Sequence, residues 1–316
     1  MKKSILFIFT ACFLFTTSCS DFLDEEHKTK YSSEYVFGTP EGLKLAVNAL
    51  YALQRYYAND TENATIFALE RGTDLAVTNG GTGNFYGIYD PNYLKPSASQ
   101  VGFMWRTMYQ IIGKANEIIA AAEDLEDTPS LRATVSEAKC FRAQSYFLLY
   151  RTFDRIWLNI QPTTAENVND PRDFHAASEK EVFDLIYEDL EYAITNLDWV
   201  SDEAGRFTQA AARHMKAKAA LWLKDWDTTL EQVEEIEKSG HFDLIALNEV
   251  FNARDLNHKE ALMVQQWSKN PGGNLSNATP KGNYYAAYFI AQYRTEIGGT
   301  AEYALSLIHI SEPTRL

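Results

Sequence analysis

Four aromatic side chains alternate with amides and a carboxylate in one short stretch of the sequence, residues 78–93. A sugar ring has an apolar face of C–H groups and a rim of hydroxyls, so a sugar site needs an aromatic platform beside planar polar groups. The stretch offers both, and its four glycines permit a close approach of the ligand. The residues of this stretch that could contact a sugar are Asn79, Asn84, Phe85, Tyr86, Tyr89, Asp90, Asn92 and Tyr93.

A second stretch, residues 268–285, also combines glycine, asparagine and aromatic residues. Trp267 and Tyr284 flank it and could form a second wall of the same site. Another role fits the residues equally well, because aromatic side chains in long loops also pin those loops to neighbouring helices. The sequence therefore predicts a ligand site between two aromatic loops and leaves the pinning role open.

Motifs for catalysis, metal binding or phosphate binding are missing from the sequence. The six histidines form no HExxH or HxH pair, and no GxSxG occurs. The glycines of residues 80–87 are not followed by Lys-Ser or Lys-Thr, as a phosphate loop requires. Forty-three carboxylates make close pairs such as Glu70 and Asp74 unavoidable, so such a pair does not indicate a glycosidase. We expect a binding protein without catalytic residues, cofactor or metal.

The N-terminus predicts a lipoprotein signal peptide, residues 1–18. Lys2 and Lys3 precede an apolar run over residues 5–15, which is shorter than the roughly 20 residues that cross a bilayer. Small residues then lead directly into Cys19, as in bacterial signals that are cleaved before a lipidated cysteine. Ordinary secretion with cleavage nearby is the alternative. We expect Cys19 to be the lipidated first residue of the mature chain.

Cysteine usage and charge narrow the remaining functions. After the signal peptide and Cys19, Cys140 is the one remaining thiol, so no internal disulfide is expected. Because Cys140 has no histidine nearby in the sequence, a buried packing role is favoured over a nucleophile. The formal net charge of −14 repels phosphate backbones, which argues against a nucleic-acid partner.

Helical periodicity dominates the rest of the chain and predicts a mainly α-helical fold. Short turns join the helices in pairs, as in tetratricopeptide-type repeats. Ser178 and Glu181 have the spacing of a capping box, Asp225–Asp227 forms a tight turn, and Gly240 stops a helix. One strand is predicted at residues 261–267. The predicted helices are residues 40–57, 101–124, 131–153, 178–197, 208–226 and 228–240.

Three stretches taken together resemble the SusD/RagB family of outer-membrane nutrient-binding lipoproteins. They are "SCSDFLDE" at residues 18–25, the helix "SEAKCFRAQSYFLLYRTFDRIWL" at 136–158, and the hairpin at 206–244 with its "SGHF" turn. The resemblance extends from residue 19 to about residue 300. The helix carries the Glu-Ala, Arg-Ala and Tyr order of that family at Glu137, Ala138, Arg142, Ala143 and Tyr146.

The resemblance implies a tetratricopeptide-like scaffold with long ligand-binding loops and little strand. It implies capture of oligosaccharide and delivery to a SusC-like TonB-dependent transporter, from an outer-membrane position held by lipid on Cys19. It also implies a ligand-contacting role for Asp74. The acidic residues 21–26 resemble a surface-export signal, although a solvated tether explains them as well.

Two alternatives to glycan capture stay open at this point. One is a protein-interaction scaffold of the tetratricopeptide kind. The other is capture of peptides, because residues 78–93 lack the tryptophan that starch binders of this family often use.

The resemblance also divides the chain. Residues 19–305 form one SusD-like domain, and residues 306–316 resemble translated sequencing-adapter sequence, which we interpret as a non-native tail. Members of that family are longer than 316 residues. We therefore expect a missing C-terminal part, with apolar surface left uncovered where it would pack.

Overall fold

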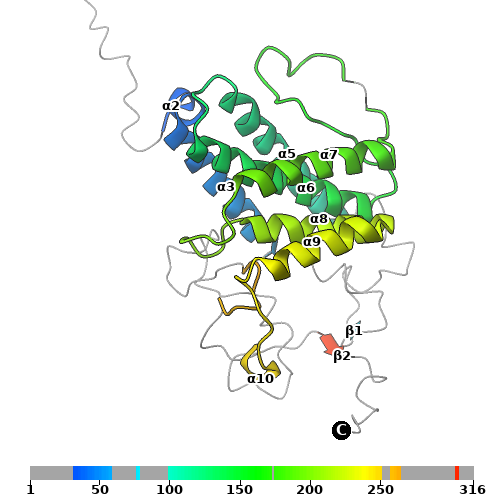
Figure 1. The fold of residues 1–316 in the computed structure, drawn as a ribbon. Helices are drawn as coiled ribbons and strands as arrows, with labels where there is room; N and C mark the ends of the chain where they lie inside the picture. The colour runs from blue at the N-terminus through cyan, green and yellow to red at the C-terminus, as the bar shows by residue number, and fades with distance from the viewer. Residues whose placement is uncertain are drawn as a thin grey trace, which may run out of the picture.

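The computed structural model describes residues 31–58, 76–78, 99–172, 174–250, 257–264 and 303–305. Helices make up most of this part of the chain, which confirms the predicted mainly α-helical fold (Figure 1). Two short strands, β1 (Ala76–Thr78) and β2 (Tyr303–Leu305), pair antiparallel. The helices are α2 (Ser33–Gly38), α3 (Pro40–Ala58), α5 (Ser99–Ala122), α6 (Pro129–Thr152), α7 (Glu179–Asn196), α8 (Gln209–Leu223), α9 (Trp226–Lys238) and α10 (Leu247–Val250).

Consecutive helices lie side by side and build a tetratricopeptide-like array. Helix α3 packs against α5, α5 against α6, α6 against α7, α7 against α8, and α8 against α9. In Figure 1 the array runs from the blue α2 and α3 to the yellow α9, while β1, β2 and α10 lie below it. Because α6 also contacts α3 and α8, it is the central helix of the array.

Local sequence signals set the ends of these helices. The predicted capping box is present, since the Ser178 side chain and the Glu181 carboxylate each accept a hydrogen bond from the other's backbone N–H. Gly240 follows the end of α9 with a φ of 68°, in the left-handed region that glycine tolerates. The turn between α8 and α9 is tighter than predicted. Lys224 adopts a φ of 60°, and the Asp225 side chain already caps α9.

The core lies between α3, α5, α6, α7 and α8. Cys140 is fully buried in it, and burial raises the pKa of its thiol. The predicted packing role of this cysteine is therefore confirmed. The largest fully buried apolar side chains are Tyr146, Phe141, Leu43, Leu50, Ile112, Ile118, Leu149, Ile186 and Leu190.

The strand predicted at residues 261–267 is wrong for residues 261–264, which form no strand, while residues 265–267 lie outside the described part. A strand needs a regular ladder of backbone hydrogen bonds. Here one isolated bond joins the Asp243 N–H to the Lys259 carbonyl at 3.3 Å, and the Ala261 N–H closes a turn onto His258 at 2.9 Å. The segment instead packs Met263 against the helical core.

Candidate functional site

The residues predicted to bind ligand, together with Cys19, lie outside the described part of the chain. The structure does describe the elements on either side of the first aromatic loop, because β1 ends at Thr78 and α5 begins at Ser99. Thr78 pairs with Tyr303 of β2. The site therefore stays a prediction at Asp74, Asn79, Asn84, Tyr86, Tyr89, Asp90, Trp267 and Tyr284.

The motif residue Arg142 lies in a buried charge cluster between α6 and α7. Its guanidinium donates to both carboxylate oxygens of Asp189, each at 2.7 Å, and the Lys139 ammonium contacts the same carboxylate at 2.8 Å. Asp189 is completely buried. Charge-assisted hydrogen bonds of this kind offset the cost of removing the groups from water. Arg142 therefore holds two helices together and is not available to a ligand.

A hydrogen-bonded clamp extends from this cluster to the segment after α6. Arg142 donates to the Asn116 side chain at 2.8 Å, and Asn116 donates to the Asn159 carbonyl at 2.9 Å. The motif residue Tyr146 donates its hydroxyl to that carbonyl and accepts from the Asn159 N–H, both at 2.7 Å. Burial raises the pKa of Tyr146, so its hydroxyl stays protonated and able to donate. The motif thus fixes the path of the chain beyond α6.

The motif residue Glu137 anchors a second buried network. Its carboxylate accepts from the Tyr51 hydroxyl at 2.5 Å and lies 3.3 Å from the Arg206 guanidinium. The Tyr51 hydroxyl in turn accepts from the Phe207 N–H at 2.7 Å. Burial raises the pKa of Glu137, while Tyr51 and Arg206 oppose that shift. The network joins α3, α6 and the turn before α8. Glu137, Arg142 and Tyr146 of the family motif thus all hold parts of the scaffold together.

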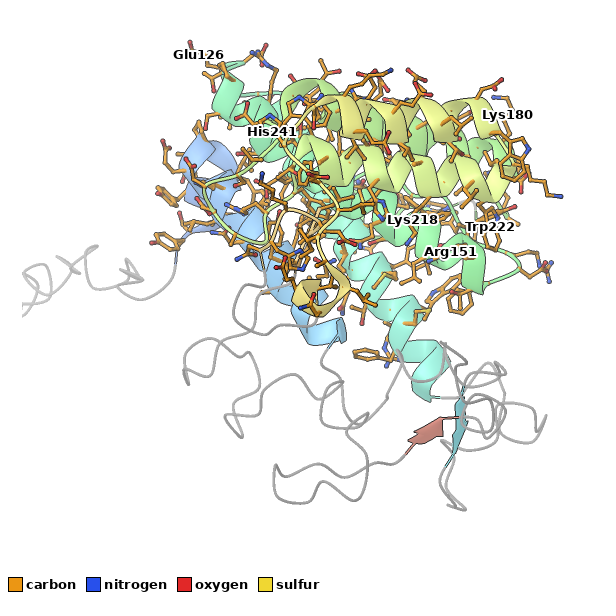
Figure 2. All side chains as sticks on the ribbon, turned by 60° about the horizontal axis from the view of Figure 1, so that its bottom comes forward. Glu126, Arg151, Lys180, Lys218, Trp222 and His241 are labelled. Carbon is orange, nitrogen blue, oxygen red and sulfur yellow. The ribbon has the colours of Figure 1, made fainter. Side chains whose placement is uncertain are left out.

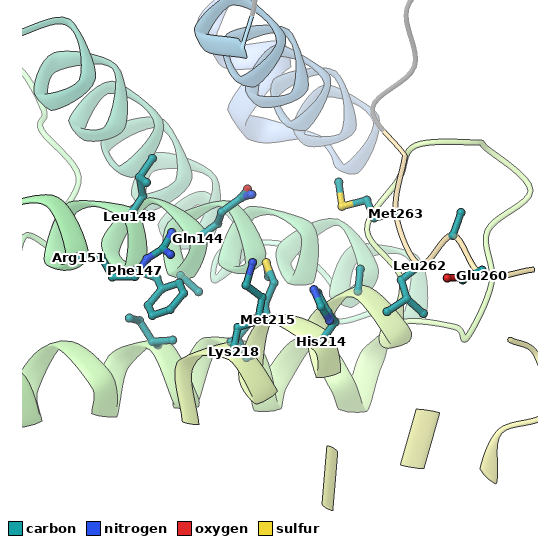
Figure 3. A pocket seen from close by; sticks show the side chains of 15 residues that line it. Gln144, Phe147, Leu148, Arg151, His214, Met215, Lys218, Glu260, Leu262 and Met263 are labelled. Carbon is teal, nitrogen blue, oxygen red and sulfur yellow. The ribbon is translucent and has the colours of Figure 1, made fainter. Parts of the chain in front are cut away.

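A pocket of about 500 Å³ opens between α6, α8 and the segment 260–263 (Figure 3). Ile186 and Leu190 of α7 also line it. Figure 2 shows the lining residues Arg151 and Lys218 on one side of the helix array, near Trp222. Trp222 does not line the pocket, but its ring meets the ring of the lining residue Phe147 edge-on at 6.4 Å. The remaining lining residues are Ala143, Gln144, Phe147, Leu148, Ala211, His214, Met215, Glu260, Ala261, Leu262 and Met263.

The pocket combines an apolar surface with basic groups. Arg151 lies over the Phe147 ring at 4.4 Å, a cation–π contact on the pocket wall. Partial burial and the neighbouring Lys218 lower the pKa of His214, so its imidazole is neutral at pH 7. Glu260 accepts from the Ile245 N–H at 3.2 Å. Such a pocket suits an apolar group that also carries a carboxylate or another acceptor.

Sequence reasoning missed this pocket, although a signal for it exists. Phe147 and Arg151 on α6, and His214 and Lys218 on α8, are each four residues apart and therefore share one face of their helix. That the two faces meet could not be read from the spacing alone. It depends on the packing of α6 and α8.

The described part of the chain contains no group of three or more His, Cys, Asp or Glu side chains that could hold a metal ion. None of its helices is both long enough and apolar enough to cross a bilayer.

The solved structures that this chain is similar to share its helical array. A SusD-like protein of Bacteroides fragilis superposes with a TM-score of 0.63 at 20% identity, over 76% of this chain and 47% of that protein. A structure with xylogluco-oligosaccharide superposes with a TM-score of 0.63 at 20% identity, over 79% of this chain and 50% of that protein. A laminarin-binding SusD-like protein superposes with a TM-score of 0.51 at 23% identity, over 66% of this chain and 45% of that protein. At these identities the likeness shows the fold.

Sequence relatives give the family. A SusD-like protein of Bacteroides ovatus is 25% identical in an alignment of length 292, which covers 84% of this chain and 50% of the relative. A SusD-like protein of Formosa agariphila is 24% identical in an alignment of length 323, which covers 94% of this chain and 59% of the relative. The chain thus spans about half the length of the curated relatives it matches. The family model SusD-like_3, described as "Starch-binding associating with outer membrane", matches residues 21–221. Since this match covers well over half of the sequence, the chain belongs to the SusD-like family.

Proposed function

We propose that this protein binds an oligosaccharide at the outer membrane and delivers it to a SusC-like TonB-dependent transporter. The observation that carries the proposal is the family match over residues 21–221, whose description names both starch binding and the outer membrane. The helix array supports it, because proteins with the same fold include one solved with xylogluco-oligosaccharide and one that binds laminarin. Binding without catalysis agrees with the missing catalytic motifs in the sequence.

The ligand site of this proposal lies in the two aromatic loops. Tyr86 and Tyr89 would stack on sugar rings, while Asn79, Asn84 and Asp90 would bond to hydroxyls. Relatives of one fold whose names mention different glycans support a site in loops, since loops vary while the scaffold is kept. Asp74, Trp267 and Tyr284 complete the proposed site.

Isothermal titration against a panel of polysaccharides tests the proposed site. The double variant Tyr86→Ala, Tyr89→Ala should raise the Kd for the best ligand by about tenfold or more, the equivalent of about 1.4 kcal/mol. The matched control is Tyr31→Ala, Tyr35→Ala, which removes two exposed, stacked tyrosines of the N-terminal region. Equal affinities of the two double variants would place the site elsewhere.

The membrane position and the transporter have separate tests. Cys19→Ala should release the protein into soluble fractions and abolish fatty-acid labelling, because the variant lacks the Cys19 thiol that would carry the acyl chains of the proposed anchor. Unchanged labelling of the variant would contradict lipidation at Cys19. Pull-down from detergent-solubilised outer membranes should recover a barrel protein, and repeated recovery of none would count against the transporter partner.

The pocket between α6 and α8 favours a second candidate function, the capture of peptides. Its apolar lining and the basic Arg151 and Lys218 would suit a peptide with apolar and acidic side chains. In a peptide panel, Lys218→Glu should abolish binding of acidic peptides, while Lys180→Glu, exposed on α7 and outside the pocket, should not. If no acidic peptide binds the wild type, this second candidate fails and glycan capture is unaffected.

A further inference from the structure

Five aromatic side chains form a continuous strip where α5 begins and α6 ends. The ring of Phe153 meets that of Trp105 at 5.0 Å, and Trp105 meets Tyr109 at 4.8 Å. Tyr109 stacks near Trp157 at 6.4 Å, and Trp157 meets Phe174 at 4.8 Å. We call these five residues the aromatic strip. It links a helix face with the segment that arches from α6 to α7 in Figure 1.

The strip is held rigidly in place. Trp105 and Tyr109 are one turn apart on α5, so their rings lie on the same face. The Tyr109 hydroxyl donates to the Trp157 carbonyl at 2.8 Å and accepts from the Trp157 N–H at 2.9 Å. Two bonds from one hydroxyl therefore fix the backbone that carries the Trp157 indole. A rigid aromatic platform binds a ring without a large loss of conformational entropy.

Part of the strip is open to solvent. Phe174 is 70% exposed, and the other four side chains are half-buried. Trp105, Tyr109 and Phe153 pack against the core on their inner sides, which leaves their outer edges uncovered. Single exposed apolar residues are common on protein surfaces, but contiguous aromatic surface more often marks a binding site.

Planar polar groups border the strip. The Arg172 guanidinium lies 5.9 Å from the centre of the Trp157 ring and donates to the Thr163 hydroxyl at 3.0 Å. On α5, Arg106 and Gln110 are exposed beside Trp105 and Tyr109. Guanidinium and amide groups can pair with neighbouring ring hydroxyls, while aromatic faces cover the C–H side of the same ring. The strip thus carries both halves of a sugar site.

We infer that the aromatic strip binds a pyranose ring of the oligosaccharide, with Trp157 and Phe174 as the platform and the Arg172 guanidinium as hydrogen-bond donor to a ring hydroxyl. The inference rests on the proposed glycan binding and adds a subsite on the helical scaffold itself. Trp105 lies six residues after Ser99, the first residue of α5, which is about 9 Å along the helix axis. The subsite therefore lies close to the end of α5 at which the first aromatic loop joins the scaffold.

Isothermal titration of strip variants with the best polysaccharide of the panel tests this inference. Phe174→Ala and Trp157→Ala should each weaken binding by about tenfold, the equivalent of one aromatic contact of about 1.4 kcal/mol. Trp226→Ala is the matched control, because Trp226 is 56% exposed on α9 and is not part of the strip. Phe174 is so exposed that its replacement should leave the melting temperature unchanged. An affinity loss in Phe174→Ala would therefore report ligand contact and not unfolding.

A spectroscopic readout separates ligand contact from a purely pinning role. Ligand should change the tryptophan fluorescence of the wild type, and Trp157→Phe should reduce that change while Trp226→Phe should not. If the wild type binds a glycan and all strip variants bind it equally well, the strip inference is overturned and the proposed function stands. If the wild type binds no glycan of the panel, both are overturned.

Discussion

Helices α6 and α9 depart from the usual distribution of side chains in opposite directions. Helix α6 buries the charged Lys139 and Arg142, whereas α9 exposes the apolar Trp226, Leu230 and Val233. The difference follows from their neighbours, because α6 is packed by α3, α5, α7 and α8, while α9 packs against α8. A helix surrounded on all sides can bury charged side chains only where a neighbouring helix supplies the opposite charge, as Asp189 of α7 does for Lys139 and Arg142.

The comparison separates two kinds of unusual residue. On α6 the buried Lys139, Arg142 and Tyr146 set the positions of other elements, since each is bonded to a partner on another helix or segment. On α9 the exposed residues Trp226, Leu230 and Val233 are spaced by four and three positions and form one apolar stripe. The first kind should matter for stability and the second should not.

The largest expected effect is on the buried charge cluster. Asp189→Ala leaves Lys139 and Arg142 buried without their counter-charge, so the free energy of unfolding should fall by about 3–5 kcal/mol. The control is Asp184→Ala on the same helix, whose exposed pair with Lys180 should contribute less than about 1 kcal/mol. Urea denaturation followed by circular dichroism measures both. Similar losses in the two variants would contradict a special role of the cluster.

A smaller loss is expected at the clamp after α6. Tyr146→Phe removes the hydroxyl that pairs with both backbone groups of Asn159, so unfolding should become easier by about 1–3 kcal/mol. Tyr150→Phe on the same helix removes an exposed hydroxyl that donates to Glu179, and it should change stability by less than about 1 kcal/mol. Urea denaturation measures the free energy of unfolding of both variants. A larger loss in Tyr150→Phe than in Tyr146→Phe would exclude the clamp as a stabilising element.

Much of the helical array could be predicted from the sequence because its signals are local. The helix predicted at residues 131–153 runs from Pro129 to Thr152, and that predicted at 178–197 runs from Glu179 to Asn196. Periodicity and caps such as Ser178 operate within a few residues, so they set helix ends well.

Contacts between distant segments could not be predicted in the same way. The order of Glu137, Arg142 and Tyr146 supported the family, but nothing in it indicated Tyr51, Asp189 or Asn159 as their partners. The strand predicted at residues 261–267 was wrong over residues 261–264 for the same reason, because a strand depends on a partner strand elsewhere. The loop site is a prediction from composition, because its residues lie outside the described part of the chain.

The network of Glu137, Tyr51 and Arg206 should make the stability of the protein depend on pH. Burial raises the folded-state pKa of Glu137 above its ordinary value of 4.5, so the native state holds this proton more tightly than the unfolded state. The contribution to stability is therefore present below about pH 4.5 and is lost as the pH rises through the raised pKa. Glu137→Gln keeps an acceptor for the Tyr51 hydroxyl but cannot titrate.

Thermal melts between pH 4 and pH 7 should show this difference. The wild type should lose stability relative to Glu137→Gln as the pH increases, and the difference should level off above the raised pKa. The control Glu181→Gln removes an exposed carboxylate whose pKa is lowered by Ser178, so its difference from the wild type should run in the opposite direction. Parallel curves for wild type and Glu137→Gln would show that burial does not govern this carboxylate.

The smallest effect on stability is expected on the α9 stripe. Trp226, Leu230 and Val233 are 56%, 59% and 42% exposed, so replacing all three by glutamine should change the free energy of unfolding by less than about 0.5 kcal/mol per site. The binding of a neutral hydrophobic dye should nevertheless fall, because the stripe is contiguous apolar surface. Glu231→Gln with Glu237→Gln, exposed on the same helix, controls for the added amides. A loss of several kcal/mol in the triple variant would mean that the stripe packs against part of the molecule. Retained stability with lost dye binding would instead mark α9 as a surface that the described fold leaves uncovered, the opposite of the fully partnered α6.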